Sequence, residues 1–245
     1  MSNINHLKAD EIMLLRSSIK SELEPFLDRI RMTPQDRLLD FKASYLKFIT
    51  RYEQSSKIVE FIMFGQIAEV DDNAPISDQL FDLFFYLGLV ESFGNCYVDL
   101  LVMLLIANGR DFHIETMHST PRIKHVNSMN DLEKEKVPLT TKLNFLKDNG
   151  IKTFSSIIDS KLRNIIAHLN FEIIENRIII KGKPTKDIIA PCFERVIIAT
   201  TEVSNSLYKL AVDLGWEKPR NGPVGKLIDD TLQAIKQSLE DSKVK

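Results

Sequence analysis

Between residues 160 and 170 the chain reads Ser160-Lys-Leu-Arg-Asn-Ile-Ile-Ala-His-Leu-Asn170, an apolar run that carries an arginine, an asparagine and a histidine. An α-helix turns about 100° per residue, so apolar residues three or four positions apart lie on one face. The residues with this spacing, which we expect to face the core, are Ile158, Leu162, Ile165 and Leu169. The pattern predicts a single helix from about residue 153 to residue 170.

Arg163, Asn164 and His168 fall on the other side of this predicted helix. Asn164 lies one turn before His168, and the small Ala167 leaves space for an anion between the arginine and the histidine. A guanidinium stays charged and offers a rigid fork of donors, whereas an imidazole titrates near neutral pH and can move a proton. The pattern indicates a phosphate site able to cut RNA without a metal. The alternative is a solvated helix face.

The segment Arg163-Asn164-Ile165-Ile166-Ala167-His168 resembles the Arg-(four to six residues)-His motif, commonly with Asn after the Arg, of HEPN domains (higher eukaryotes and prokaryotes nucleotide-binding). The resemblance covers residues from about 77 to 214. Many prokaryotic members are metal-independent endoribonucleases of toxin–antitoxin, abortive-infection and CRISPR-associated defence systems. The resemblance implies that Arg163 and His168 are catalytic and that Asn164 supports them.

The resemblance also implies a mechanism and partners. The ribose 2′-hydroxyl of single-stranded RNA would attack the adjacent phosphorus and leave a 2′,3′-cyclic phosphate, with no metal and no cofactor. One histidine per chain supplies only one acid–base group, so we expect a homodimer with a shared site. A nucleotidyltransferase-type antitoxin is a further expected partner. Two alternatives stay open: a non-catalytic HEPN-like protein that binds a nucleotide or partner, and an unrelated helical interaction protein.

Composition fits a folded protein in a reducing cytoplasm. The 245 residues are 44% hydrophobic and 27% charged, with a net charge of −2, so RNA binding would need local patches. Cys96 and Cys192 lack metal-type or disulfide-framework spacing, and residues 1–11 lack the order of a signal peptide. The apolar stretch 80–107 is interrupted by acidic residues, so we interpret it as a buried helix and expect no membrane association.

The spacing of apolar residues predicts an all-α, antiparallel helical bundle. The expected helices cover residues 9–31 (kinked or divided at Pro25), 34–70, 77–108, 139–147, 153–170, 187–214 and 224–239. Two β-favouring runs between residues 171 and 184 predict a small hairpin after the motif helix, with an irregular connection as the alternative. We expect three parts: N-terminal helices 1–75, packed on the core; a HEPN-like core 76–215; and a C-terminal linker and helix 216–245.

Glu91, Asn95 and Asp99 are spaced by four residues and are expected to share one helix face near the motif. Residues 58–109 contain eight acidic residues and no Lys or Arg, so Arg163 is the natural partner for Glu91 or Asp99. The HEPN resemblance agrees, because the family often carries a polar residue on an earlier helix near its motif. The alternative is that these carboxylates face solvent or a subunit interface.

Residues 110–137 are polar and predict a long loop with a short helix after Thr120-Pro121. Four residues of this segment could track a phosphate backbone: Arg110, Arg122, Lys124 and His125. The alternative is a solvated loop, since acidic residues are interspersed with them. The spacing of His113, Glu115, His118 and His125 matches no standard ligand pattern, so no metal site is assigned.

Overall fold

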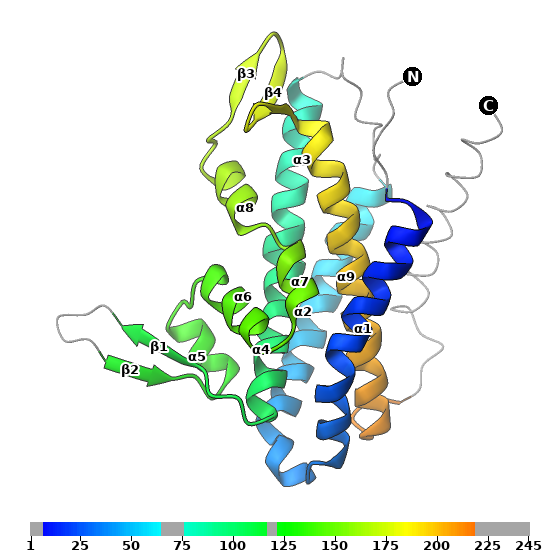
Figure 1. Cartoon of the computed structure of the whole chain (residues 1–245), viewed down its shortest axis with the longest axis vertical. Coiled ribbons are helices and arrows are strands. Elements are labelled where there is room, and N and C mark those ends of the chain that lie inside the picture. The colour runs from blue at the N-terminus through cyan, green and yellow to red at the C-terminus, as the bar shows by residue number, and fades with distance from the viewer. Residues whose placement is uncertain (1–6, 65–75, 117–121, 219–245) are drawn as a thin grey trace.

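The computed structural model describes residues 7–64, 76–116 and 122–218 of the chain (Figure 1). Helices dominate these residues, and the strands form two small antiparallel sheets. The predicted all-α fold class with a small β-hairpin is confirmed. The expected helix 224–239 and the Thr120-Pro121 turn lie outside the described residues.

Long helices run along the long axis of the molecule (Figure 1). They are α1 (Ala9–Met32), α2 (Leu39–Phe64), α3 (Ile76–Leu89), α4 (Asn95–Ala107) and α9 (Thr185–Asp213). A π-helical turn, η2 (Val90–Gly94), joins α3 to α4. Helix α4 is almost wholly buried, as expected for the stretch 80–107. Helix α3 buries only one face, with Leu83, Tyr86 and Leu89, and leaves Phe81 and Phe84 about half exposed. Across the described residues, none of the helices combines the length and apolarity required to cross a membrane.

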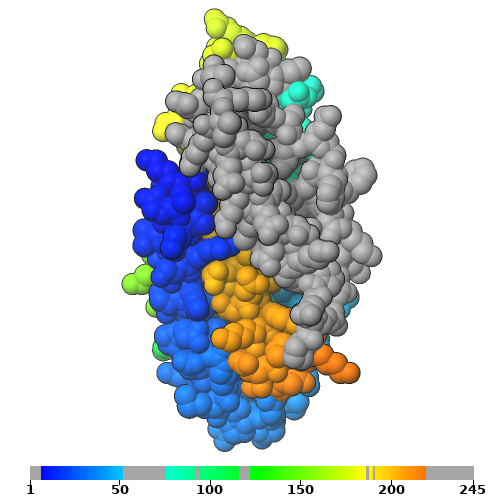
Figure 2. All heavy atoms as spheres, turned by 90° about the vertical axis from the view of Figure 1, so that its right-hand side faces the viewer, coloured from blue at the N-terminus to red at the C-terminus, as the bar shows by residue number. Residues whose placement is uncertain are grey.

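Helix α1 lies beside α9, and the two border each other on the face in Figure 2. Its residues Ile19, Leu23, Leu27 and Ile30, three or four positions apart, are almost completely buried. This is the apolar stripe of an amphipathic helix. Pro25 lies inside α1 without dividing it, contrary to one reading of the sequence.

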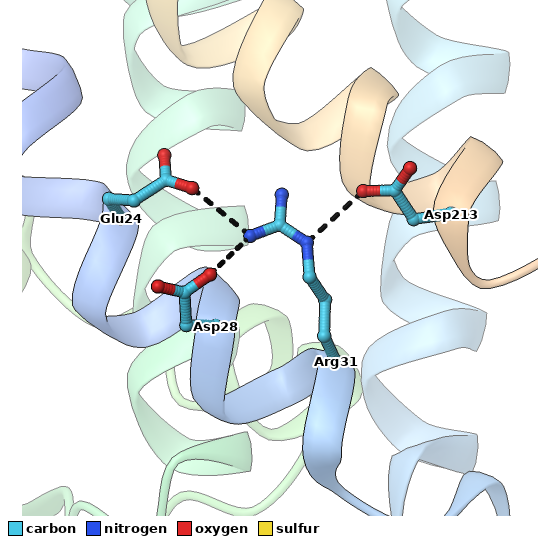
Figure 3. A network of polar contacts seen from close by, with 4 residues as sticks. All are labelled: Glu24, Asp28, Arg31 and Asp213. Carbon is cyan, nitrogen blue, oxygen red and sulfur yellow. Dashed lines mark hydrogen bonds and ion pairs between the residues drawn. The ribbon is translucent and has the colours of Figure 1, made fainter.

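Arg31, in the last turn of α1, fastens α1 to the end of α9 (Figure 3). Its Nη1 donates to Glu24 at 3.1 Å and to Asp28 at 2.6 Å, both on α1, and its Nε donates to Asp213 at 3.1 Å. Three carboxylates on one guanidinium fix its orientation, and only one of them comes from another helix. The network therefore links the end of α1 to the end of α9.

The N-terminal helices share one hydrophobic core with the rest of the described chain. Helix α2 follows a 3₁₀ turn, η1 (Gln35–Leu38), and packs along α4. Beyond α9, Trp216 contacts the rings of Phe41 and Tyr45 on α2, with centroids 5.8 and 6.1 Å away. Its indole N–H donates to Gln35 at 3.0 Å. Segments from both ends of the described chain thus meet in one packed unit.

Residues 110–137 are more ordered than the predicted loop. They form a β-hairpin of β1 (His113–Thr116) and β2 (Arg122–His125), followed by helix α5 (Met129–Lys134). The expected short helix after Thr120-Pro121 is wrong for residues 122–125, which are strand. Pairing between the two strands, four residue pairs from His113–His125 to Thr116–Arg122, overrides the polarity of the local sequence here.

The predicted hairpin after the motif is confirmed. It consists of β3 (Glu172–Ile174), β4 (Arg177–Ile180) and a short β5 (Lys183–Pro184). Glu175 and Asn176 form the turn with φ of 49° and 65°, the left-handed values that a tight two-residue hairpin turn requires. The side chain of Gln79 on α3 donates to the carbonyl of Asn176 at 3.2 Å and accepts from the N–H of Ile178 at 2.9 Å. The sheet is therefore attached to α3.

Candidate functional site

The predicted motif helix is two helices in the structure. Helix α7 (Lys152–Ile157) ends before an extended pair, Ile158 and Asp159, and α8 (Ser160–Ala167) begins after it. One oxygen of Asp159 accepts from the backbone N–H groups of Lys161 and Leu162, both at 2.9 Å. Asp159 is thus an N-cap, a role for which aspartate is among the best residues. The single helix expected over residues 153–170 is therefore wrong.

Helix α8 also stops earlier than predicted. Its C-cap is His168, and Leu169 adopts the left-handed conformation with φ of 54°. The N–H of Asn170 donates to the carbonyl of Ile165 at 2.8 Å, and that of Leu169 to Ile166 at 3.1 Å. These two bonds define a Schellman motif, which usually has glycine where Leu169 stands. The turn is therefore strained, directly after the histidine of the motif.

The early stop changes the core face of the helix. Ile158 and Leu162 are buried as predicted, and Ile165 is partly buried against the core. Leu169 is 58% exposed because it lies beyond the last turn, and Ile166 is fully buried instead. The prediction for Leu169 is wrong for this reason.

Arg163 lies in the middle of α8 and pairs with Glu91 of η2. Its Nε donates to Glu91, and its Nη1 donates to the side-chain oxygen of Asn164 at 2.8 Å. The guanidinium is thus held from two directions, by a residue of another element and by its own neighbour. Both partners of this ion pair are about one-third exposed, so the guanidinium still meets solvent.

The π-helical turn explains why Glu91, but not Asn95 or Asp99, contacts Arg163. Glu91 is the second residue of the π-turn, and the extra residue that such a turn inserts rotates Glu91 about the helix axis relative to the residues that follow the turn. Asn95 and Asp99 follow the turn and accept hydrogen bonds, each at 2.6 Å, from Lys142 of helix α6 (Leu139–Asp148). The stripe expected on one face is therefore divided between two neighbouring helices. The structure brings Glu91, but not Asn95 or Asp99, to the motif arginine.

Lys142 is the residue that sequence reasoning missed. It is only 5% exposed, and its ammonium is held by Asn95 and Asp99. Burial raises the pKa of Asp99, and the positive charge of Lys142 opposes that shift. A signal was present: Lys142 lies three residues after Leu139 and four before Leu146, in the apolar stripe of α6. A lysine in a core stripe indicates a buried carboxylate partner.

Gly94, the last residue of the π-turn, allows this turn to pack closely against the extended pair between α7 and α8. A Cβ at Gly94 would lie 3.2 Å from the Cδ1 of Ile158, closer than most real contacts of this kind. Ile158 is the first residue of the extended pair and is buried. The missing side chain therefore lets the start of α8 approach the element that carries Glu91.

His168 is exposed at the end of α8, five residues after Arg163. A solvent-exposed imidazole can exchange protons with a bound substrate, and the partly exposed guanidinium can bind a phosphoryl oxygen. Arg163, Asn164 and Glu91 are in direct contact, and His168 is joined to Asn164 through the backbone, where its N–H donates to the Asn164 carbonyl at 3.1 Å.

The basic residues predicted to bind RNA weakly lie elsewhere. Figure 1 places β1 and β2 beside α5, away from α8. Lys124 pairs with Glu135, and the Nδ1 of His125 lies 2.8 Å from a carboxylate oxygen of Asp111. Arg110 and Arg122 are exposed on the same segment. The structure therefore does not bring these four residues to the motif.

The described residues contain no group of three or more His, Cys, Asp or Glu side chains suited to hold a metal ion. His118, one of the histidines considered from the sequence, lies outside the described residues. Comparison of the chain with family models, curated proteins and solved structures gave no match.

Proposed function

We propose that this protein is a HEPN-like, metal-independent endoribonuclease that cleaves single-stranded RNA at Arg163 and His168. The observation that carries the proposal is the fixed guanidinium of Arg163, held by Glu91 and Asn164 on the short helix that ends in the exposed His168. Preorganised donors aimed at a developing negative charge are the usual basis of such catalysis.

In the proposed reaction the ribose 2′-oxygen forms a bond to the adjacent phosphorus as its proton leaves. The bond from phosphorus to the 5′-oxygen breaks, and that oxygen takes a proton, so the products are a 2′,3′-cyclic phosphate and a 5′-hydroxyl. His168 moves a proton, and Arg163 stabilises the extra charge on the phosphoryl oxygens. Two of the five N–H donors of Arg163 serve Glu91 and Asn164, which leaves three for phosphate as far as the described residues go.

A homodimer would supply the second acid–base group. Three large apolar side chains within six residues of His168 in the sequence are half exposed or more: Leu169 at 58%, Ile173 at 54% and Ile174 at 50%. Ile173 and Ile174 point to opposite faces of β3, so pairing around a two-fold axis at this end of α8 would cover part of this apolar surface and bring two motifs together. Sedimentation should then give a dimer at micromolar concentration, and a strict monomer would count heavily against a shared site. An antitoxin of the nucleotidyltransferase type remains part of the proposal through the HEPN resemblance alone.

The test is incubation of purified protein with labelled single-stranded RNA in excess EDTA, followed by analysis of the product ends. We expect cyclic-phosphate ends from the wild type and a loss of about 100-fold or more in rate for His168→Ala and for Arg163→Ala. His113→Ala, which removes an exposed histidine on β1, is the matched control and should cleave normally. Single-stranded DNA should stay intact because it lacks the attacking hydroxyl.

The second candidate is a non-catalytic HEPN-like protein that binds a nucleotide or a partner. The ion pair between Arg163 and Glu91 favours this second function, because Glu91 already neutralises the charge that would stabilise the transition state of cleavage. If no RNA is cleaved, and a mononucleotide binds saturably to the wild type but not to Arg163→Ala, this second function replaces the first.

A further inference from the structure

A hollow of about 420 Å³ lies between α6, α7 and the first residue of α8. It is lined mainly by polar side chains. Those that can donate a hydrogen bond to an anion include Asn144, Lys147, Lys152, Ser155, Ser156 and Ser160. Lys147 lies in the last turn of α6 and Lys152 begins α7, so the two ammonium groups come from opposite sides of the turn that connects these helices.

The lining of the hollow is positively charged. It includes Lys147 and Lys152 and no acidic residue, whereas the full chain carries a net charge of −2. Two acidic groups nearby are already bound: Glu22 accepts from the backbone and hydroxyl of Thr153 at 2.8 to 3.1 Å, and Asp159 caps α8. Asp148 follows Lys147 in the chain but does not line the hollow. The ion pairs among the described residues do not involve Lys147 or Lys152. Their charge is therefore available to an anion.

The hollow and the motif lie along the same side of α8, because Ser160, Asn164 and His168 are spaced by four residues. Ser160 lines the hollow, Asn164 lies one turn further, and His168 one turn beyond that. At a rise of about 1.5 Å per residue, Ser160 and His168 are about 12 Å apart along the axis. A single strand whose scissile phosphate sits at Arg163 and His168 can therefore reach the hollow within a few nucleotides.

We propose that the hollow between Lys147 and Lys152 is a subsite for backbone phosphates of the same RNA strand, a few nucleotides from the cleaved bond. Lysine ammonium groups attract phosphate without reading sequence, and the amide of Asn144 and the hydroxyls of serine add neutral donors. The inference rests on the proposed function for its choice of RNA as the ligand. It adds that the strand crosses from α8 toward α6.

The test measures binding without cleavage, on the full chain, with oligonucleotides whose riboses carry 2′-O-methyl groups. The variant Lys147→Gln/Lys152→Gln is compared with Lys209→Gln/Lys218→Gln, which removes two exposed lysines near the end of α9. Each phosphate contact of a single strand contributes a slope of about −0.7 to log K against log salt. We expect the slope of the Lys147/Lys152 variant to fall by about 1.4 and its affinity by about tenfold at low salt, with little change for the control.

Length separates the subsite from the cleavage site. A dinucleotide spans only the scissile bond, so its binding should not respond to Lys147→Gln/Lys152→Gln, whereas a ten-nucleotide strand should. Equal slopes for both lysine pairs, or a wild type that binds no RNA, would overturn the inference. A wild type that binds through the hollow but never cleaves leaves the inference standing and removes the proposed ribonuclease function. Inorganic phosphate should compete weakly with the long strand.

Discussion

Leu169 carries the clearest local strain near the motif, because a leucine occupies a left-handed position with φ of 54°. This conformation costs an L-residue about 1 kcal/mol of conformational free energy, whereas glycine adopts it at almost no cost. Since Leu169 is mostly exposed, little packing is lost on its removal. We expect Leu169→Gly to raise the free energy of unfolding by about 1 kcal/mol in urea denaturation. Leu169→Ala keeps the Cβ and serves as control; a glycine variant less stable than the alanine variant would contradict the strain argument.

Asp82 on α3 makes stability depend on pH. Burial, and then the charge of Asp78, raise its pKa from 3.8 to about 6. The folded state therefore holds the proton more tightly than the unfolded state, so stability falls as pH rises from about 4 to about 6 and is level above that. Asp82 is only half-buried, so after allowing for solvent screening we expect Asp82→Asn to gain about 1 kcal/mol at pH 7.

The measurement for Asp82 is the pH profile of the urea midpoint. The gain of Asp82→Asn over the wild type should vanish at about pH 3, below both pKa values, where the wild-type carboxyl is protonated in both states. Asp148→Asn, at an exposed position on α6, is the matched control. A gain for Asp82→Asn that is the same at about pH 3 and pH 7 would show that packing and not ionisation is responsible.

Helices α4 and α6 are joined by the buried pair of Lys142 and Asp99. Removal of the lysine leaves a buried carboxylate without its cation, so we expect Lys142→Met to cost about 3 to 5 kcal/mol at pH 7. Without Lys142 the pKa of Asp99 rises further, and protonation at lower pH relieves the cost. The loss, measured against wild type by urea denaturation, should therefore shrink between pH 7 and pH 5.

The double variant Lys142→Met/Asp99→Leu is the control for that argument. It removes both charges, so it should recover most of the stability lost by Lys142→Met and show no matching change with pH. A double variant as unstable as the single one would mean that Lys142 acts through packing alone.

Sequence patterns located most elements but not the points where helices break. The apolar spacing of α1 and the β-favouring runs of β3 and β4 are local, so both elements could be predicted. The π-turn, the Ile158–Asp159 break and the early end of α8 depend on distant contacts or on a strained turn. Gly94, for example, matters only because Ile158 packs against it.

The same limit applies to the candidate site. The contact between Arg163 and Asn164 is between neighbours, and a carboxylate partner for Arg163 could be proposed from charge alone. The choice of Glu91 over Asp99 could not, since it follows from the rotation at the π-turn. Asp99 pairs instead with Lys142, because α6 packs on α4, and these two residues are 43 positions apart in the sequence.

At the scale of the molecule, the N-terminal helices and the motif depend on one core. Helix α1 contacts α7, the helix before the motif, as well as α9. The bond from Thr153 to Glu22 and the pair of Arg31 with Asp213 join the same elements. The position of α7, the helix before the motif, therefore depends on residues about 130 positions earlier, outside the core 76–215 expected from the sequence. The three-part division made from sequence remains to be tested.

A fragment of residues 76–245 tests that division. It lacks α1 and α2 and would expose the surfaces of α9 and α4 that bury Leu23, Ile30 and Phe41 in the full chain. The described part of residues 1–75 buries eight large side chains almost completely: Ile19, Leu23, Leu27, Ile30, Leu38, Phe41, Tyr45 and Phe48. At about 2 kcal/mol each, their loss is about 16 kcal/mol, which exceeds the stability of about 5 to 15 kcal/mol of an ordinary domain. We expect the fragment to unfold without a cooperative transition in calorimetry, and co-expression with residues 1–75 to restore a complex that melts like the full chain. A fragment that melts cooperatively by itself would show that residues 76–215 form an independent domain, with α1 and α2 as an addition to it.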